Sequence, residues 1–459
     1  MKKLLIFAIL ALFTIFTLHA EVPLRGSLEF YSGFNSYDSE FCRNAINSNL
    51  VFQKAMNKTT VVVDIQADYD TAQGSSAIRS LFGPAYNAEN TSINSSFINS
   101  ENQKKQKDIF IREAFINQDF HLSVFDSFSL RAGKIITKWG YTEFFNPVDI
   151  INPQDYSFHL MNNAIKRKKG IYAIYPTLFF SRYFSVDGLI NPVFEADNEF
   201  SSAFMHENSA NFFNAVEVFD GAFYGEEQPE ASLSQASYGA RAGLHLQTFQ
   251  GHLMYYRGYD HSPTYTLKDD AGQTAITAEY KQVTMGGMDF MANLIWDINL
   301  KGELAYYNKG KFFAIKDSEI ASDIADGGNG YEESPLLDYT TGFEIVKDWP
   351  GNTFLINFEY NQNIVIDHSN TMDQKKYRNR FISEIQLKFA EKKAYVMNCS
   401  IYTLEDNDLG SQFELGLKPE NMYVIKTGYW IFHKFSDEEG LMGRHHKKDF
   451  IYFAGDIYF

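Results

Sequence analysis

The chain is poor in the residues that mark several protein classes. It holds 2 Cys, 11 Pro and 30 Gly in 459 residues. Two cysteines are too few for a disulfide-rich scaffold or a cysteine-based metal framework. The ordinary Gly and Pro content excludes a collagen-like or low-complexity chain. A hydrophobic share of 45% is too high for a disordered protein.

Positive charge is also scarce. Lys and Arg total 41 against 57 Asp and Glu, which gives a net charge of -16. Nucleic acid is therefore not an expected partner, because a phosphate-binding surface needs an excess of basic residues. The sequence contains no Gly-x-Ser-x-Gly elbow, His-Glu-x-x-His or phosphate-cradling loop. His445 and His446 stand among Arg444, Lys447 and Lys448, which favours a solvated basic loop over a metal site. We expect no enzymatic activity and no cofactor.

A long apolar run occurs only at the N-terminus. The basic start at residues 1–3 precedes an apolar run over residues 4–18, and Ala20 supplies a small residue before a cleavage point. This layout predicts a secretory signal peptide over residues 1–20, with an uncleaved membrane anchor as the alternative. No later apolar stretch reaches the roughly 20 residues that a membrane-spanning helix needs. The mature chain, 21–459, is therefore expected to be exported.

Aromatic residues are abundant. The chain has 42 Phe and 28 Tyr, residues that favour strands and the interfaces between lipid and water. Many segments alternate apolar and polar residues with period two, the mark of a half-buried strand. Between residues 353 and 366, apolar Phe354, Ile356 and Phe358 alternate with polar Asn357 and Glu359. A soluble β-sandwich would alternate in the same way.

Connection lengths distinguish the two folds. Short turns near 349–352 and 391–393 alternate with long polar loops such as 309–335 and 434–448. This asymmetry is typical of outer-membrane barrels. The sequence predicts an all-β, single-domain transmembrane antiparallel up-and-down barrel of 18 strands, with 16 as the alternative. The expected strands are 25–34, 48–55, 59–70, 108–121, 127–137, 170–176, 180–190, 236–248, 251–259, 276–291, 297–308, 336–347, 353–366, 377–390, 394–405, 411–417, 421–433 and 449–459.

The last predicted strand carries the most specific pattern. Its apolar residues alternate from Ile451 to the final residue, Phe459. This resembles the C-terminal signature by which bacterial outer-membrane barrels are recognised for assembly. The resemblance implies an assembly signal at Phe453, Ile457 and Phe459, the barrel assembly machinery as a partner, and the outer membrane of a diderm bacterium as the location.

The polar faces of the strands should line a lumen. Because lipid offers no hydrogen bonds, a spanning sheet must close on itself with its apolar face outward. A barrel of this size is too wide for side chains to fill and should hold water. Cys399 falls on the apolar face and Cys42 in the first external loop, so we expect no disulfide between them. The expected pore-lining residues carry both signs of charge and are Asp64, Asp68, Arg131, Arg241, Lys301, Glu303, Glu344, Glu359, Arg378, Arg380, Glu384 and Lys388.

The loop after the fifth predicted strand, residues 138–169, carries a distinctive motif. Gly133-Lys134 is followed by Trp139-Gly140, then by Asn-Pro-x-Asp at 146–149 and Asn-Pro at 152–153. This pattern resembles a stretch in a poorly characterised family of porin-like outer-membrane barrels. In general porins this loop often folds inward and narrows the pore. The resemblance therefore implies a constriction loop with Trp139, Gly140, Asn146, Pro147, Asp149, Asn152, Pro153, Lys166, Arg167, Lys168 and Lys169.

Purely structural interpretations of these loops are also open. Asn-Pro pairs also serve as turn residues. The basic run 166–169 could draw anions to the mouth or form a solvated rim that contacts lipopolysaccharide or phosphate. The loop 191–235 has many acidic residues and no Lys or Arg. Its Phe residues could make it a plug, a cover or a plain surface loop; they are Phe200, Phe204, Phe212, Phe213, Phe219 and Phe223.

These features predict a porin-like channel for passive diffusion of ions or small hydrophilic solutes. One alternative is a facilitator of hydrophobic substrate uptake that captures its substrate at 191–235. Another is a surface-exposed adhesin or antigen that uses the external loops. The expected partners are outer-membrane lipid, lipopolysaccharide or its equivalent, and small solutes. A homotrimer is an open alternative, because trimers are common among porins.

Overall fold

The structure is a computed structural model that describes most of the predicted barrel. The predicted signal peptide, the loop 71–106 and Lys166 lie outside the described residues. Those residues are 24–35, 41–70, 107–122, 125–155, 167–198, 223–270, 273–316, 318–319, 322–323, 326, 328–420, 422–435, 442–443 and 449–459.

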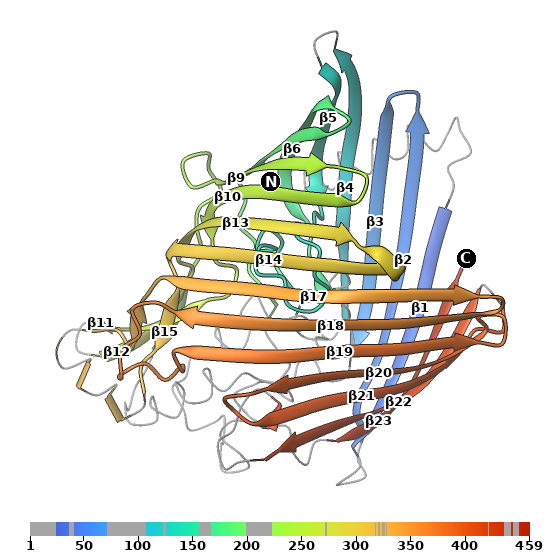
Figure 1. Ribbon diagram of the computed structural model, residues 1–459. Coiled ribbons are helices and arrows are strands. Elements are labelled where there is room, and N and C mark those ends of the chain that lie inside the picture. The colour runs from blue at the N-terminus through green and yellow to red at the C-terminus, as the bar shows by residue number, and fades with distance from the viewer. Residues whose placement is uncertain are drawn as a thin grey trace.

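The fold is a closed sheet of 18 strands, as predicted, and the 16-strand alternative is wrong. Each strand pairs antiparallel with the next one around the barrel, and the pairing of the last strand with the first closes it (Figure 1). In chain order the strands are β1 (Leu24–Asn35), β2 (Phe41–Met56), β3 (Thr59–Asp70), β4 (Lys107–Leu122), β5 (Phe125–Ile135), β6 (Ile171–Ser181), β7 (Phe184–Asn191), β9 (Ser237–His245), β10 (Phe249–Tyr259), β13 (Gln282–Asn293), β14 (Ile298–Lys309), β17 (Leu336–Trp349), β18 (Asn352–Val365), β19 (Tyr377–Phe389), β20 (Ala394–Thr403), β21 (Asp408–Leu417), β22 (Tyr423–Lys434) and β23 (Phe450–Tyr458).

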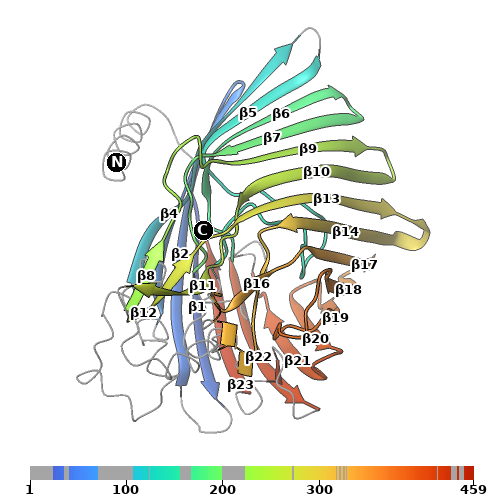
Figure 2. The same cartoon turned by 90° about the vertical axis from the view of Figure 1, so that its left-hand side faces the viewer.

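The strands are steeply tilted. In Figure 1 the strands of the near wall, such as β17 and β18, cross those of the far wall, such as β2 and β3, at a wide angle. Figure 2, turned by a quarter, shows the strands β5 to β14 fanning out along one wall. Crossed near and far walls follow from the tilt that closure of a barrel requires.

Connections are short at one end of the barrel and long at the other. The turn between β2 and β3 uses only residues 57–58, and the turn between β17 and β18 uses 350–351. The opposite end carries two small sheets: β8 (Phe223–Glu227), β11 (Thr264–Asp270) and β12 (Gln273–Glu279) form one, and β15 (Phe312–Ala314) and β16 (Tyr331–Glu333) form the other. Figure 1 shows β11, β12 and β15 together, away from the β17–β18 turn. Among the described residues, no helix has the length and apolar character needed to cross a membrane.

Two strand predictions need correction. The predicted strand 276–291 is in fact two strands, β12 and β13, separated at Tyr280 and Lys281. β12 pairs with β11 and β8 outside the barrel sheet, while β13 pairs with β10 and β14 within it. Each strand alternates on its own, with a shift of phase at Lys281 and Gln282, and alternation does not say which sheet a strand joins. The second strand begins at Phe41, so Cys42 lies in β2 rather than in a loop.

The register shows which residues face inward, because residues directly opposite on antiparallel strands share a face. Outward positions such as Leu253 and Phe453 are 66% and 60% exposed. Inward positions such as Glu359 are buried. Cys399 lies opposite Glu384, so the prediction that it faces lipid is wrong.

The physical reason is a local inversion of the pattern in β20. Asn398 and Ser400 take the outward face, opposite Phe413 and Ser411. Their polar groups are satisfied within the sheet, since Asn398 Nδ2 donates to the Ser411 hydroxyl at 3.0 Å and the two serine hydroxyls lie 2.8 Å apart. The apolar Met397 and Ile401 and the thiol therefore face inward with Glu384.

Candidate functional site

The described parts of the loop between β5 and β6, residues 136–155 and 167–170, lie in the barrel interior instead of projecting outward. Its entry is tied to the wall, since the amide of Ile136 donates to Glu113 Oε1 at 2.8 Å. Asn152 joins the two arms of the loop. Its Oδ1 accepts from the amide of Thr137 at 2.9 Å, and its Nδ2 donates to the carbonyl of Lys169 at 2.8 Å. Asn152 thus does more than make a local turn.

Carboxylates of the barrel wall hold the innermost part of the loop. Asp289 on β13 accepts from the amide of Gly140 at 3.1 Å. Glu303 Oε1 on β14 accepts from the amides of Tyr141 and Thr142, both at 2.7 Å, and from the Thr142 hydroxyl at 2.6 Å. This segment has no regular secondary structure, so its amides need acceptors from elsewhere. The wall provides them.

Gly140 is required at this contact. Its φ is +89°, a conformation that side chains disfavour. A Cβ at this position would lie 2.3 Å from Glu303 Oε1. Any larger residue would push the loop off its carboxylate.

A third carboxylate continues the attachment. Glu359 on β18 accepts from the amide of Glu143 at 2.8 Å and from that of Phe144 at 3.2 Å. The ring centre of the next side chain, Phe145, lies 4.7 Å from the central guanidinium carbon of Arg380 on β19. The loop therefore runs along the inner wall from β13 to β19.

The other side of the loop is apolar. Trp139 is fully buried in a cluster with Ile135, Val148 and Ile151. Its indole N–H donates to the hydroxyl of Tyr175 on β6 at 3.2 Å. The apolar face fixes the loop against the wall by burial, and the carboxylates fix its backbone.

The two Asn-Pro pairs also bond within the barrel. Asn146 Nδ2 lies 3.0 Å from the Thr142 hydroxyl, and the carbonyl of Pro147 accepts from Tyr307 of β14 at 2.7 Å. The carbonyl of Pro153 accepts from the amide of Lys169 at 2.8 Å. Turn chemistry and inward folding thus use the same residues.

Part of the basic run 166–169 is engaged inside the protein. Lys168 forms a buried ion pair with Asp149, and its ammonium also donates to the carbonyl of Thr137 at 2.9 Å. Burial raises the pKa of the Asp149 carboxyl and lowers the pKa of Lys168, and each charge offsets the shift of the other. Burial likewise lowers the pKa of Lys169, whose ammonium donates to the carbonyl of Ala196 at 2.7 Å. These ammonium groups hold the loop together.

The register places every expected pore-lining residue on the inward face. Several are paired there: Arg241 Nη2 lies 2.6 Å from Asp187 Oδ2, and Lys301 Nζ lies 3.0 Å from Glu344 Oε2. The sequence reasoning missed Glu113 and Asp289, which hold the loop. Their inward position on the predicted strands was the available signal.

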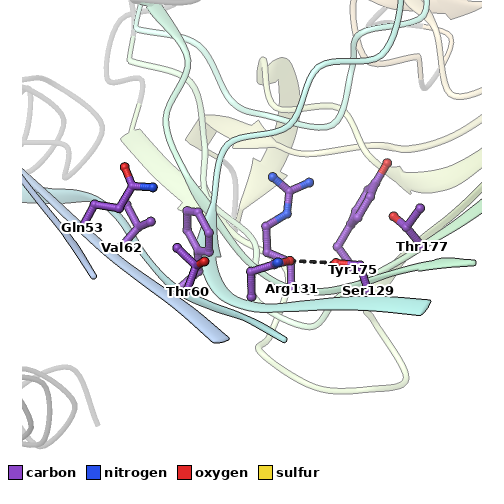
Figure 3. A pocket seen from close by; sticks show the side chains of 9 residues that line it. Gln53, Thr60, Val62, Ser129, Arg131, Tyr175 and Thr177 are labelled. Atoms are coloured by element: carbon purple, nitrogen blue, oxygen red, sulfur yellow. Dashed lines mark hydrogen bonds between the residues drawn. The ribbon is translucent and has the colours of Figure 1, made fainter. Parts of the chain in front are cut away.

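One cavity borders the loop itself, and another lies against the neighbouring strands β2 to β6. The first, of about 520 Å³, is lined by residues that include Tyr141, Arg241 and Lys301. His252 also lines it and lies 2.6 Å from Asp289, Nδ1 to Oδ1. The other cavity, of about 300 Å³, is lined by residues from β2 to β6 (Figure 3).

Loops that follow β7 and β10 attach to the inward loop. Asp197 accepts from the amide of Gln154 at 2.6 Å and from the Ser262 hydroxyl at 2.7 Å. Within the acidic loop 191–235, residues 199–222 lie outside the described part, and with them all its predicted plug residues except Phe223. Phe223 begins β8, which pairs in parallel with β12.

The predicted assembly signal lies at the seam of the barrel. The backbone of Phe459 exchanges two hydrogen bonds with Gly26, at 2.8 and 3.0 Å. Phe453 and Phe459 are exposed on the outward face.

The chain resembles several solved structures in overall shape. OccAB1 of Acinetobacter baumannii has a TM-score of 0.49 at 8% identity over 95% of both chains. A BenF-like porin from Pseudomonas fluorescens has 0.47 at 11% identity over 96% of this chain and 98% of that one. Wzi of Escherichia coli is a carbohydrate-binding outer-membrane β-barrel involved in group 1 capsule assembly. It has a TM-score of 0.47 at 9% identity, over 95% of this chain and 84% of that one. No function follows from likenesses this distant.

No curated protein matches the sequence. One family does, over residues 31–415, and its description reads "Protein of unknown function (DUF1302)". Because this match covers most of the 459 residues, the chain belongs to the DUF1302 family.

Proposed function

We propose that this protein is an outer-membrane channel for the passive diffusion of ions and small hydrophilic solutes. The observation that carries the proposal is the segment 136–155, fastened to the inner wall of a closed 18-stranded barrel. A barrel of this size leaves an interior that wall side chains alone do not fill. A fixed loop then sets the width of the passage.

The two faces of the wall support a membrane location. Large apolar side chains such as Leu253, Phe413 and Phe453 are exposed on the outward face. Charged residues such as Asp64 and Lys301 are on the inward face. Only a closed barrel can present a β-sheet to lipid, since every backbone group is then paired.

The attached loop would filter solutes by size and charge. It covers the wall from β5 to β19, so the passage runs along the remaining strands and past the loop's edge. At that edge Lys138 and Glu143 lie 3.9 Å apart, and Lys301 lies 3.6 Å from Glu143. These groups would be the first charges that a solute meets at the narrowest point.

Single-channel recording tests this proposal. The mature protein would be refolded, checked for the heat-sensitive gel mobility of a closed barrel, and inserted into a planar bilayer in KCl. Steady ohmic current steps are the expected result. A folded, inserted barrel that gives no steps would contradict the proposal.

A further inference from the structure

Arg131 on β5 is an inward-facing cation without a polar partner. It makes no hydrogen bond or ion pair within the described ranges, in contrast to Arg241 with Asp187 and Lys301 with Glu344. A guanidinium cannot lose its charge at ordinary pH. Arg131 therefore carries donors that only water or a ligand can satisfy.

Aromatic rings hold this guanidinium in position. Its central carbon lies 5.0 Å from the centre of the Tyr175 ring and 5.8 Å from that of Phe115. Figure 3 shows Arg131 and Tyr175 projecting side by side from the wall. The Tyr175 hydroxyl is itself held by the indole of Trp139. Stacking leaves the edge of a guanidinium, where its donors are, free to bind.

The cavity in front of Arg131 has about 300 Å³ and otherwise uncharged walls. Gln53, Thr60 and Asn117 line it with amide and hydroxyl groups. The carboxylates nearby are occupied: Glu113 accepts from the amide of Ile136, and Asp187 pairs with Arg241. Glu113 is close enough to feel the charge of Arg131, but no described carboxylate forms an ion pair with it.

We propose that this cavity binds the carboxylate or phosphate group of a small hydroxylated solute. The planar fork of Arg131 can donate two parallel hydrogen bonds to such an oxyanion. Gln53 and Thr60 can bond its hydroxyl groups. The proposal rests on the proposed channel function, because the solute reaches the cavity through the barrel interior.

Calorimetric titration of the refolded protein in detergent tests this site. The probes are glycerate, glycerol 3-phosphate and uncharged glycerol, which share one carbon skeleton. At least one anion should bind, and glycerol should not. The tighter of the two anions identifies the group that the site prefers. Equal binding of glycerol and the anions would overturn the proposal.

The variant Arg131→Gln should weaken anion binding by roughly tenfold or more, since hydrogen bonds to charged groups are among the stronger ones. Arg131→Lys keeps the charge but loses the fork, so its affinity should be intermediate. Lys388→Gln on β19 is the charge-matched control, because it also removes one inward positive charge. It should keep the wild-type affinity. Wild-type affinity in a folded Arg131→Gln barrel would refute the site.

These results separate the two proposals. Anion binding in a barrel that gives no current steps would leave the site standing and reject the channel. Current steps without anion binding would reject the site and leave the channel standing.

Discussion

Single carboxylates on the barrel wall determine where the inward loop lies. Glu303 is the clearest case, because one of its oxygens accepts from the amides of Tyr141 and Thr142 and from the Thr142 hydroxyl. A buried amide that loses its acceptor costs about 1–3 kcal/mol. A single wall residue can therefore decide whether the loop stays attached.

Replacing Glu303 with alanine should loosen the loop. We expect the barrel to assemble, because the change removes no strand pairing, while single-channel current becomes noisier and its mean conductance changes. Glu344→Ala is the matched control, since Glu344 also lies inward but bonds Lys301 and Asn299 rather than the loop backbone. Equal current noise in the two variants would count against the anchoring role of Glu303.

The buried pair Asp149–Lys168 gives a second prediction at this scale. Removing one partner leaves the other charge buried and unpaired, which typically costs about 3–5 kcal/mol. Removing both partners leaves no buried charge. We therefore expect Asp149→Asn or Lys168→Met to lower the free energy of unfolding by about 3 kcal/mol each. The double variant should lose much less than the sum. Urea unfolding in lipid vesicles measures this, and strict additivity would show that the charges do not interact.

At the scale of elements, the last strand closes the barrel. Phe459 exchanges backbone hydrogen bonds with Gly26, and a Cβ on Gly26 would lie 2.5 Å from the Phe459 ring. Closing the seam leaves no free sheet edge, which a strand in lipid cannot tolerate.

Deleting Phe459 should reduce the assembled fraction of the protein several-fold, because the seam loses its last pair. The measurement is the fraction with the gel mobility of a folded barrel before heating. Phe413→Ala removes an exposed outward ring away from the seam and is the control. If both changes reduce assembly equally, the loss reflects lipid contact rather than seam closure.

The strands also show where alternation is an incomplete guide. It located the barrel strands because an inward polar face and an outward apolar face impose period two. It failed to separate β12 from β13, although the phase of the alternation shifts at the adjacent polar residues Lys281 and Gln282. It misplaced Cys399 because Asn398 and Ser400 take the outward face, where both bond the Ser411 hydroxyl of β21. Such pairings across strands are invisible in one segment.

At the scale of the whole molecule, the inward face is more acidic than basic. Lys168 and Lys169 do not offset this, because they bond within the loop assembly. The inward acidic residues include Glu29, Asp64, Asp68, Glu113, Asp187, Asp289, Glu303, Asp338, Glu344, Glu359, Glu384, Asp408, Glu414 and Asp456, and the inward basic ones include Arg25, Arg131, Arg241, Lys301, Arg378, Arg380, Lys388, Lys426 and Lys434.

We therefore expect a preference for small cations in a KCl gradient, since charges lining a pore raise the local concentration of the opposite ion. The reversal potential measures it, and the preference should weaken at high salt. Lys169→Met should leave the potential nearly unchanged, because this ammonium bonds the carbonyl of Ala196. An anion-selective wild-type channel would contradict the expectation. The unpaired Arg131 is a local exception within this acidic interior.

The sequence by itself determined the class of the fold. The barrel class follows from local alternation and turn residues, which act over a few residues. So do the short and long connections and the inward position of Glu303 or Arg241. The choice of 18 strands over 16 came from the structure. It also singled out the segment from Trp139 to Asn152 by resemblance.

Only the tertiary structure decided what these residues contact. Glu303 lies 161 positions from Thr142, and Glu359 lies 216 from Glu143. Lys168, which sequence alone allowed as a rim charge, is buried against Asp149. Closure of the barrel brings such residues together, and no local pattern encodes a partner at that separation. The same closure leaves Arg131 without an ion-pair partner among the described residues, which its own neighbours in the chain could not reveal.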